Sequence, residues 1–325
     1  MKRDSYMDLL KGILIILVIV GHTTAHAENM TILYNIIYSF HMPFMIYISG
    51  YIEEMNAEKY SQAKNKMILA RVNSLLIPYI VWVFIDCIRN LVDNPFGWKI
   101  FIDRLMGYTQ SGLWFLAVLF GLKIMHVLLW ILKGKKYDRI IDTIINIAVL
   151  GLLEIMLMLI AYISKFPYLI NMISYAIPYF LGVLMVRDEM IKKITKKKVV
   201  VALCMIVYVV GIRWFSFYNT NWTTQLLRII LSCTMIIMAM SLKEKVAVDN
   251  VWIEKICILG KNSMIIYLLH GVFIDYGSLI SKVDSVFIAG VLHICLAVMV
   301  GVVCIILGKI LCKLPYVGRL LFGIE

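Results

Sequence analysis

Charged residues are scarce in this sequence. Only 16% of the 325 residues are Asp, Glu, Lys or Arg, whereas 62% are hydrophobic. A soluble core formed by a chain of this length cannot bury so much apolar surface. The composition therefore excludes a soluble globular enzyme, and it also excludes disordered and fibrous proteins. It predicts a protein whose solvent is a lipid bilayer.

Several chemical signatures are also missing. The sequence has no GxSxG, HExxH or Walker A motif, so three common routes to hydrolysis and nucleotide binding receive no support. The seven cysteines lack CxxC spacing and lie mostly within apolar runs, which is typical of buried thiols. The six histidines are scattered along the chain. We therefore expect no metal site and no bound cofactor.

Apolar runs dominate what remains. The runs cover residues 9–27, 32–51, 72–90, 112–132, 140–163, 168–186, 199–217, 226–242, 257–280 and 286–312. A helix that crosses a bilayer needs about 20 residues, and none of these runs alternates as a lipid-facing β-strand does. The predicted fold is all-α: a polytopic membrane helix bundle of about ten transmembrane helices. We expect a single domain over residues 1–325, with no fused soluble domain.

The positive charge has a topological explanation. The formal net charge is +12, and most of the 32 Lys and Arg residues fall in alternate connecting segments when the N-terminus is placed inside. Basic residues collect in cytoplasmic segments of membrane proteins. We therefore predict that both termini are cytoplasmic and that nucleic acid is not a partner. The Lys-rich stretch 192–198 is interpreted as a topology anchor, and contact with anionic lipid is the alternative.

The first apolar run contains two ionisable residues that share a helix face. Lys11 and His22 are eleven positions apart, which is three helical turns plus about 20°, or about 16 Å along the axis. Taken alone, Lys11 is explained by snorkelling and His22 by helix packing. Because both project from one face, the pair favours a functional site with a cation at the inner end and an imidazole near the outer end.

Other polar groups interrupt the later runs. His41 lies close to Pro43, whose missing N–H predicts a kink and a cavity wall. In the ninth run, Ser263, Tyr267 and His270 follow the i, i+4, i+7 pattern of one helix face.

Three charged residues lie deep within the predicted spans: Asp86, Lys123 and Glu154. Either carboxylate could form an ion pair with Lys123 or orient a histidine, and the sequence leaves both possibilities open.

A set of short motifs, in a fixed order and spacing, resembles the acyltransferase-3 family. The motifs are Asp8-Leu9-Leu10-Lys11-Gly12, Gly21-His22, Phe40-His41-Met42-Pro43 with Ile48-Ser49-Gly50-Tyr51, Arg71 with Pro78-Tyr79, Leu113-Trp114-Phe115-Leu116, and Leu259-Gly260-Lys261-Asn262-Ser263 with Tyr267-Leu268-Leu269-His270. The members of this family are integral-membrane O-acyltransferases that mostly decorate bacterial surface glycans. The resemblance extends from about residue 6 to residue 270.

The resemblance implies a multi-pass enzyme of the bacterial plasma membrane. It would move an acyl group, usually acetyl, from cytoplasmic acetyl-CoA to a hydroxyl of a surface polysaccharide, peptidoglycan or a lipid-linked sugar. His22 and His41 are the implied catalytic residues, and His22 would act either as the base or as a transient acyl acceptor. The implied donor-binding cations are Lys11 and Arg71. The pocket candidates are Asp8, Trp114, Ser263, Tyr267 and His270.

The sequence departs from the family pattern at one position. The third span of the family often begins with an Arg-x-x-Arg pair, but Ser74 follows Arg71 at the second place. A grip on the donor by two arginines is therefore not expected. Two other functions remain open: a transporter or flippase for a lipid-linked glycan or small solute, and a non-catalytic assembly or sensory protein. The imidazole at His22 favours the enzyme, because a transporter has no need of a base there.

Overall fold

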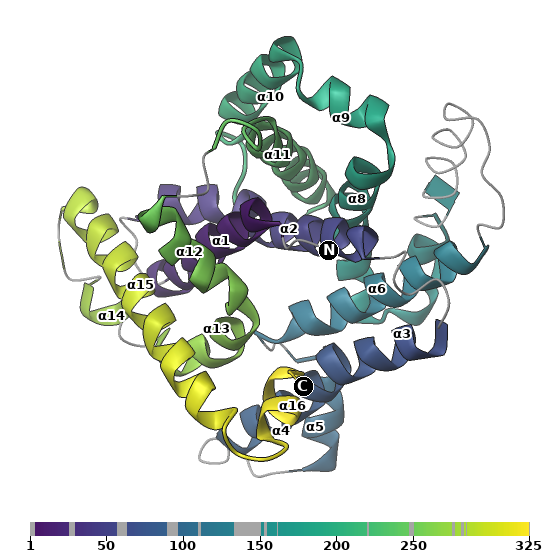
Figure 1. The fold of residues 1–325 in the computed structure, drawn as a ribbon, viewed down its shortest axis with the longest axis vertical. Coiled ribbons are helices and arrows are strands. Elements are labelled where there is room, and N and C mark those ends of the chain that lie inside the picture. Colours follow the sequence, from purple (N-terminus) through teal and green to yellow (C-terminus); the bar gives the residue numbers. More distant parts are fainter. Residues whose placement is uncertain are drawn as a thin grey trace. The chain divides into compact units, whose positions relative to one another are not determined.

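The computed structural model describes residues 4–25, 30–56, 64–89, 97–109, 112–132, 151–152, 155–160, 162–219, 221–246, 250–274, 277–280, 283 and 285–324. Every regular element in these ranges is a helix (Figure 1). Six continuous helical segments are long and apolar enough to cross a membrane: Ser5–Thr24, Thr31–Met55, Met67–Arg89, Pro167–Arg187, Trp222–Ser241 and Val286–Leu311. The prediction of an all-α polytopic membrane protein is confirmed, and the count of ten spans stays a prediction.

The chain divides into two compact units, and the helix α2 (Thr31–Met55) belongs to both. The first unit comprises Met1–Ile48 and Met190–Leu311. Its other helices are α1 (Ser5–Thr24), most of α9 (Glu189–Thr195), α10 (Lys198–Gly211), α11 (Trp222–Ser241), α12 (Val251–Lys261), α13 (Ser263–Leu269), the 3₁₀ turn η4 (His270–Val272), α14 (Gly277–Ile280) and α15 (Val286–Leu311).

The second unit comprises Ser49–Glu189 and Cys312–Glu325. Its described helices are α3 (Lys64–Arg71), the π-helical turn η3 (Val72–Leu76), α4 (Ile77–Arg89), α5 (Trp98–Leu105), α6 (Trp114–Leu132), α8 (Pro167–Arg187) and α16 (Val317–Phe322).

Most of the predicted spans match these helices, with three exceptions. The seventh run, 199–217, extends six residues beyond α10, which ends at Gly211. The fifth run, 140–163, lies largely outside the described residues, and so does Glu154. The ninth run, 257–280, is not one helix, so that prediction is wrong. Helix α12 begins earlier and ends at Lys261, and α13 starts two residues later. Asn262, at the junction, has φ −105° and ψ 16°, which lies outside the α-helical region and separates the two helices.

Helix α1 forms the centre of the first unit, and its start is well capped. The Asp4 carboxylate accepts hydrogen bonds from the backbone N–H groups of Tyr6 (3.1 Å) and Met7 (3.3 Å). These bonds satisfy two of the N–H groups that a helix start leaves unpaired. The same carboxylate binds the Lys243 ammonium at 2.6 Å, so the cap also ties the start of α1 to the segment after α11.

Helices α1 and α12 cross in close contact, and both contribute a glycine to the crossing (Figure 1). A Cβ atom added to Gly12 would overlap the carbonyl of Ile256, and one added to Gly260 would overlap the carbonyl of Asp8. The atoms in the way belong to backbone, so they cannot rotate aside. Small residues of this kind let two membrane helices approach closely.

The substitution Gly260→Ala is therefore expected to destabilise the first unit. The added methyl group would lie 2.8 Å from the Gly12 nitrogen, and overpacking of this kind costs about 1–3 kcal/mol. The measurement is the thermal unfolding midpoint of the purified protein in detergent. Gly290→Ala in α15 is the matched control, because its Cβ would have no neighbour within 4 Å. An equal loss in both variants would contradict the close crossing.

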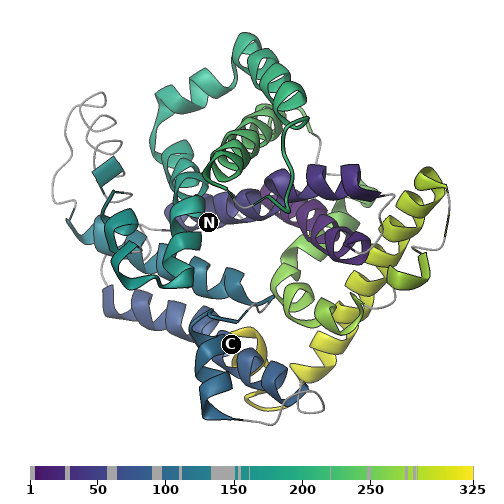
Figure 2. The ribbon, with the colours of Figure 1, turned by 180° about the vertical axis from the view of Figure 1, so that it is seen from behind.

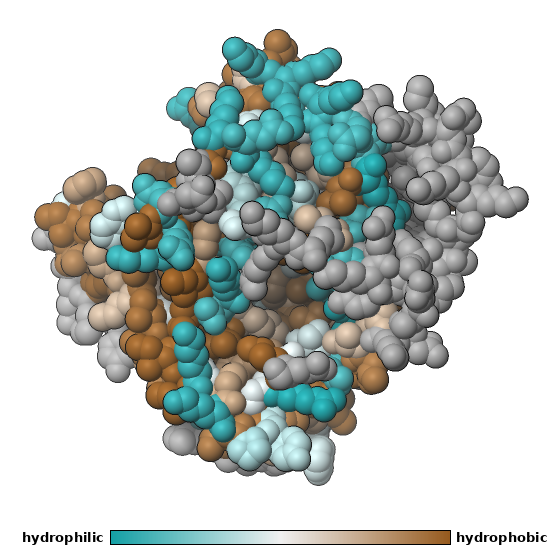
Figure 3. All heavy atoms as spheres, viewed as in Figure 1, coloured by the Kyte–Doolittle hydropathy of each residue, from teal (hydrophilic) through white to brown (hydrophobic). Residues whose placement is uncertain are grey.

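Helix α15 carries the surface that best fits lipid. It lies beside α13 in both ribbon views (Figure 2), and it also contacts α1. Apolar side chains cover its outer surface (Figure 3), among them the exposed Phe287, Met299 and Ile310. An exposed apolar strip of this length is stable against acyl chains and costly against water.

The C-terminal helix α16 anchors itself to the second unit. The Trp82 indole N–H of α4 donates a hydrogen bond to the Leu321 carbonyl at 2.8 Å. Gly323 ends α16 with φ +63°, where a side chain would be strained, and it packs directly on the backbone of Ser74. The small side chain at Ser74 thus fits a position where the C-terminal segment approaches closely.

Candidate active site

Three of the predicted site histidines gather in the first unit. His22 lies near the end of α1, His41 on α2 and His270 in η4. The ring centroids of His22 and His270 are 5.3 Å apart, with the planes tilted by 44°. Tyr38 lies between His22 and His41: its ring centroid is 6.4 Å from that of His22 and 4.7 Å from that of His41. We refer to His22, His41, His270 and Tyr38 as the histidine cluster.

The hydrogen bonds of two cluster members fix their neutral tautomers. His41 places Nδ1 2.7 Å from the Ile37 carbonyl, and His270 places Nδ1 2.6 Å from the Tyr267 carbonyl. A carbonyl oxygen only accepts, so Nδ1 carries the proton and Nε2 keeps a lone pair. The Nε2 atom of His270 is buried and has no hydrogen-bond partner among the described residues. Such an atom is costly unless something binds it, so the arrangement suits a site that receives a proton or a hydroxyl group.

Two residues were not predicted from the sequence: Tyr38, a member of the cluster, and His293, which lies beside it. His293 of α15 is fully buried and lies 3.1 Å from the hydroxyl of Thr23, the residue after His22. No motif surrounds it, so only its position in an apolar run could have drawn attention to it. The signal for Tyr38 was its place one helical turn before His41.

Lys11 is confined by an ion pair at the other end of α1. Its ammonium lies 3.0 Å from the carboxylate of Asp8, which is 2% exposed, while Lys11 is 19% exposed. Gly260 of α12 packs against the backbone carbonyl of Asp8. Lys11 therefore lies beside α12, and an anionic ligand at this place would meet a cation whose charge is partly balanced.

Tyr267 of α13 extends the cluster, and Ser263 lies at the start of the same helix. Tyr267 is buried, and its ring centroid lies 5.9 Å from that of His270. Ser263 is the first residue of α13 and is half-buried. Tyr267 and His270 therefore lie together despite the break at Asn262, and the pocket predicted from the ninth run stays a prediction.

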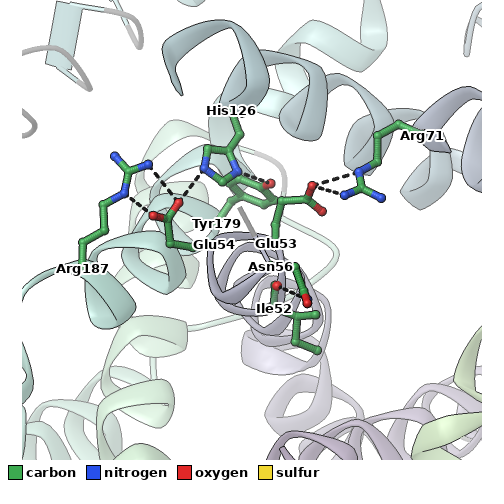
Figure 4. A network of polar contacts seen from close by, with 8 residues as sticks. All are labelled: Ile52, Glu53, Glu54, Asn56, Arg71, His126, Tyr179 and Arg187. Carbon is green, nitrogen blue, oxygen red and sulfur yellow. Dashed lines mark hydrogen bonds and ion pairs between the residues drawn. The ribbon is translucent and has the colours of Figure 1, made fainter. Parts of the chain in front are cut away.

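The second unit contains buried ion pairs around two consecutive carboxylates (Figure 4). Glu53, which is 2% exposed, accepts from Arg71 Nε at 2.9 Å and binds the Lys123 ammonium at 3.0 Å. These contacts join the end of α2 to α3 and α6. Arg71, predicted as a donor ligand, is thus held in place by Glu53, which the sequence analysis did not select.

The neighbouring carboxylate holds a second set of partners. Glu54 accepts from His126 Nε2 at 2.9 Å and from the guanidinium of Arg187, whose Nη2 lies at 2.9 Å (Figure 4). The other ring nitrogen of His126, Nδ1, lies 3.3 Å from the Tyr179 hydroxyl. Consecutive residues on a helix point in different directions, which explains why the two glutamates recruit separate partners.

The structure gives the contacts of the other residues singled out in this unit, and the pocket role of Trp114 stays a prediction. Lys123 is paired with Glu53, and Asp86 forms an ion pair with Arg104 of α5. Trp114 begins α6 and stacks on Tyr175, with ring centroids 5.1 Å apart and planes inclined by 23°. Within the described residues, no group of three His, Cys, Asp or Glu side chains could hold a metal ion.

The comparison with known families decides the class of protein. A family described as an acyltransferase domain (Acyl_transf_3) matches residues 4–309. The chain belongs to the acyltransferase-3 family. This match spans nearly the whole sequence, covers residues of both units and confirms the resemblance carried by the motifs. None of the curated proteins and none of the solved structures compared with the chain matches it.

As a member of the acyltransferase-3 family with six apolar helices of spanning length, the protein is a membrane acyltransferase. An acyltransferase needs an acyl donor, an acceptor and a group that handles the acceptor's proton. Histidine is the side chain that enzymes use most often for the third task, and the histidine cluster holds three imidazoles.

Proposed function

We propose that the protein is an O-acetyltransferase of the bacterial plasma membrane. It transfers an acetyl group from cytoplasmic acetyl-CoA to a hydroxyl of a cell-surface polysaccharide, of peptidoglycan or of a lipid-linked sugar. The observation that supports this most directly is the contact between His22 and His270, with His41 linked to His22 through Tyr38. Together these residues offer imidazole nitrogens to a hydroxyl group at one end of α1.

In the direct reaction, His22 acts as the base. An imidazole nitrogen takes the proton of the sugar hydroxyl while its oxygen attacks the thioester carbon. A C–O ester bond forms and the C–S bond breaks. The proton then passes from the imidazolium to the thiolate, which leaves as CoA-SH, so the histidine returns to its neutral form.

His22 could instead carry the acetyl group for part of the cycle. In that sequence the imidazole nitrogen attacks the thioester, an acyl-imidazole forms and CoA-SH departs. The sugar hydroxyl then attacks the acyl carbon, loses its proton and restores the imidazole. His41 and His270, whose Nε2 atoms keep lone pairs, are proposed to take that proton and pass it to His22, which thereby regains the proton it gave to the thiolate.

The proposed contacts with the donor are cationic, because CoA carries phosphate groups. Within the first unit the candidate is Lys11, which lies beside Asp8. Within the second unit the candidate is Arg71, and Glu53 fixes the direction of its guanidinium. In the family pattern a second arginine often stands at the position of Ser74. In this chain Arg71 would therefore bind the donor without a second arginine.

Mass spectrometry of surface glycans from matched cells tests the proposal. Cells with the protein are expected to contain glycan species heavier by one or more acetyl groups than cells from which it has been removed. Restoring the wild-type chain is expected to restore the heavier species. Identical glycan masses in both kinds of cell, with the protein abundant in the membrane, would sink the proposal, and transport of an unmodified glycan would then become the leading explanation.

A further inference from the structure

Aromatic rings continue the histidine cluster along one face of α2. Tyr34, Tyr38 and His41 are spaced at i, i+4 and i+7, which places them on one side of the helix. The rings of Tyr34 and Tyr38 are stacked, with centroids 4.1 Å apart and planes inclined by 29°. The stack thus leads from the cluster toward the N-terminal end of α2.

The segment after α10 adds two more rings. Tyr218 stacks on Tyr34 with centroids 5.6 Å apart and planes only 11° from parallel. Phe217 lies across both tyrosines of α2, 5.4 Å from Tyr34 and 4.4 Å from Tyr38. We refer to Tyr38, Tyr34, Phe217 and Tyr218 as the aromatic ladder.

Hydrogen bonds hold the outer end of the ladder in position. The backbone N–H of Phe217 donates to the side-chain carbonyl of Asn35 at 3.1 Å. The Tyr218 hydroxyl donates to the Ala25 carbonyl, at the end of α1, at 3.4 Å. Tyr34, which lies between Tyr38 and Tyr218 in the ladder, is only 6% exposed, whereas Tyr218 at the outer end is 64% exposed. One end therefore contacts the histidine cluster, and the other presents an aromatic face to the surroundings.

Exposed aromatic residues at a membrane surface often serve only as interfacial anchors. Trp214 and Trp222 in the same region are 73% and 72% exposed, which suits that role. The ladder differs from them because its rings stack on one another and lead back to the histidines. Packing directed in this way is typical of a ligand site, where aromatic walls adjoin a few polar groups.

We propose that the aromatic ladder is a subsite for the sugar chain of the acceptor. The inference rests on the proposed O-acetyltransferase function. A sugar ring has an apolar face of C–H groups, which packs on an aromatic face, and its hydroxyl groups can bond to phenolic oxygens. The residue that receives the acetyl group lies at the histidine cluster, and an adjoining sugar residue stacks on Tyr218. The acceptor is therefore a saccharide of at least two residues.

Steady-state kinetics in detergent test the subsite. The probe is the set of oligosaccharides released from the glycan of cells that lack the protein, offered with acetyl-CoA. Tyr218→Ala is expected to raise the acceptor KM about five- to tenfold, the range of one aromatic contact. The donor KM and the thermal unfolding midpoint in detergent are expected to stay unchanged, which separates lost acceptor binding from a damaged fold.

Two further variants keep the test specific. Trp214→Ala removes an equally exposed aromatic ring that is outside the ladder, and it is expected to leave the acceptor KM unchanged. Tyr218→Phe keeps the ring and removes the hydroxyl that bonds to Ala25. Its acceptor KM is expected to stay close to the wild-type value. If Tyr218→Phe raises the acceptor KM as much as Tyr218→Ala does, the effect comes from the hydrogen bond to Ala25, and the stacking proposal is wrong.

The outcomes also separate this inference from the proposed function. If the wild-type protein transfers acetyl groups and Tyr218→Ala has the wild-type acceptor KM, only the subsite is wrong. If Trp214→Ala and Tyr218→Ala raise the acceptor KM equally, the ladder has no special role. If the wild-type protein transfers no acetyl group to any saccharide, the proposed function itself fails.

Discussion

Replacing His22 with alanine is expected to abolish acetyl transfer while leaving the protein in the membrane at its normal abundance. A positioned acid–base group contributes about 10²–10⁴-fold to a rate, and a nucleophile contributes at least as much. The half-buried side chain projects from α1 toward His270 and Tyr38, so its removal leaves the backbone contacts of α1 intact. The measurements are acetyl content of the glycan and the amount of protein in purified membranes.

Thr24→Ala is a suitable control on the same helix. The Thr24 hydroxyl bonds to the Val20 carbonyl of its own helix at 2.8 Å, so its loss removes a local bond and leaves the cluster in place. We expect this variant to keep most of its activity. Full acetylation of the glycan by the His22→Ala protein would eliminate His22 from the chemical step.

The two mechanisms for His22 differ in a covalent intermediate. Incubation with radiolabelled acetyl-CoA in the absence of acceptor is expected to label the protein only if the imidazole attacks the thioester. Label that is retained by the wild-type chain and missing from His22→Ala would establish the acyl-imidazole route. Loss of activity in His22→Ala without any labelled wild-type protein would establish the direct route.

Replacing Glu53 with glutamine is expected to have the largest effect on stability. The carboxylate is 2% exposed and binds both Arg71 and Lys123, so the change leaves two cations facing a neutral amide. Breaking a buried ion pair by removing one partner costs about 3–5 kcal/mol. The measurement is the thermal unfolding midpoint in detergent, and we also expect a higher KM for acetyl-CoA because Arg71 loses its fixed direction.

Glu244→Gln is the control for that experiment. It removes the carboxylate of another ion pair, with Lys196, but Glu244 and Lys196 are 73% and 45% exposed. Exposed ion pairs contribute little to stability because water and salt screen them. We expect the unfolding midpoint of this variant to stay near the wild-type value. Similar midpoints for Glu53→Gln and Glu244→Gln would show that the buried network stabilises nothing.

Much of the fold could be predicted because bilayer insertion depends on local composition. A run of apolar residues long enough to span the hydrocarbon layer forms a helix wherever it lies in the chain. The boundaries of α1, α2, α8 and α15 accordingly lie close to the predicted ones. The ninth run failed as a single helix because its break at Asn262 depends on backbone angles rather than on hydropathy.

The candidate site was predictable to a smaller extent. Polar residues stand out within apolar runs, as His22, His41 and His270 do. An ionisable side chain in a membrane span has a high free-energy cost, so its presence indicates a functional site. Tyr38 and the aromatic ladder were not selected, because a tyrosine in a membrane helix has no such cost. Their importance depends on stacking between rings of α2 and the segment after α10.

The sequence by itself determined that the chain is a helical membrane protein of the acyltransferase-3 family and which histidines stand out in it. Both follow from residue types and spacings along the chain. Only the tertiary structure decided the partners of two charged groups: Lys123 with Glu53, and Asp86 with Arg104. Both pairs join separate helices, whereas Lys11 and Asp8 are three residues apart on α1. Helix packing determines which carboxylate pairs with a buried cation. The sequence alone contains several carboxylates that could form the pair with similar free energy.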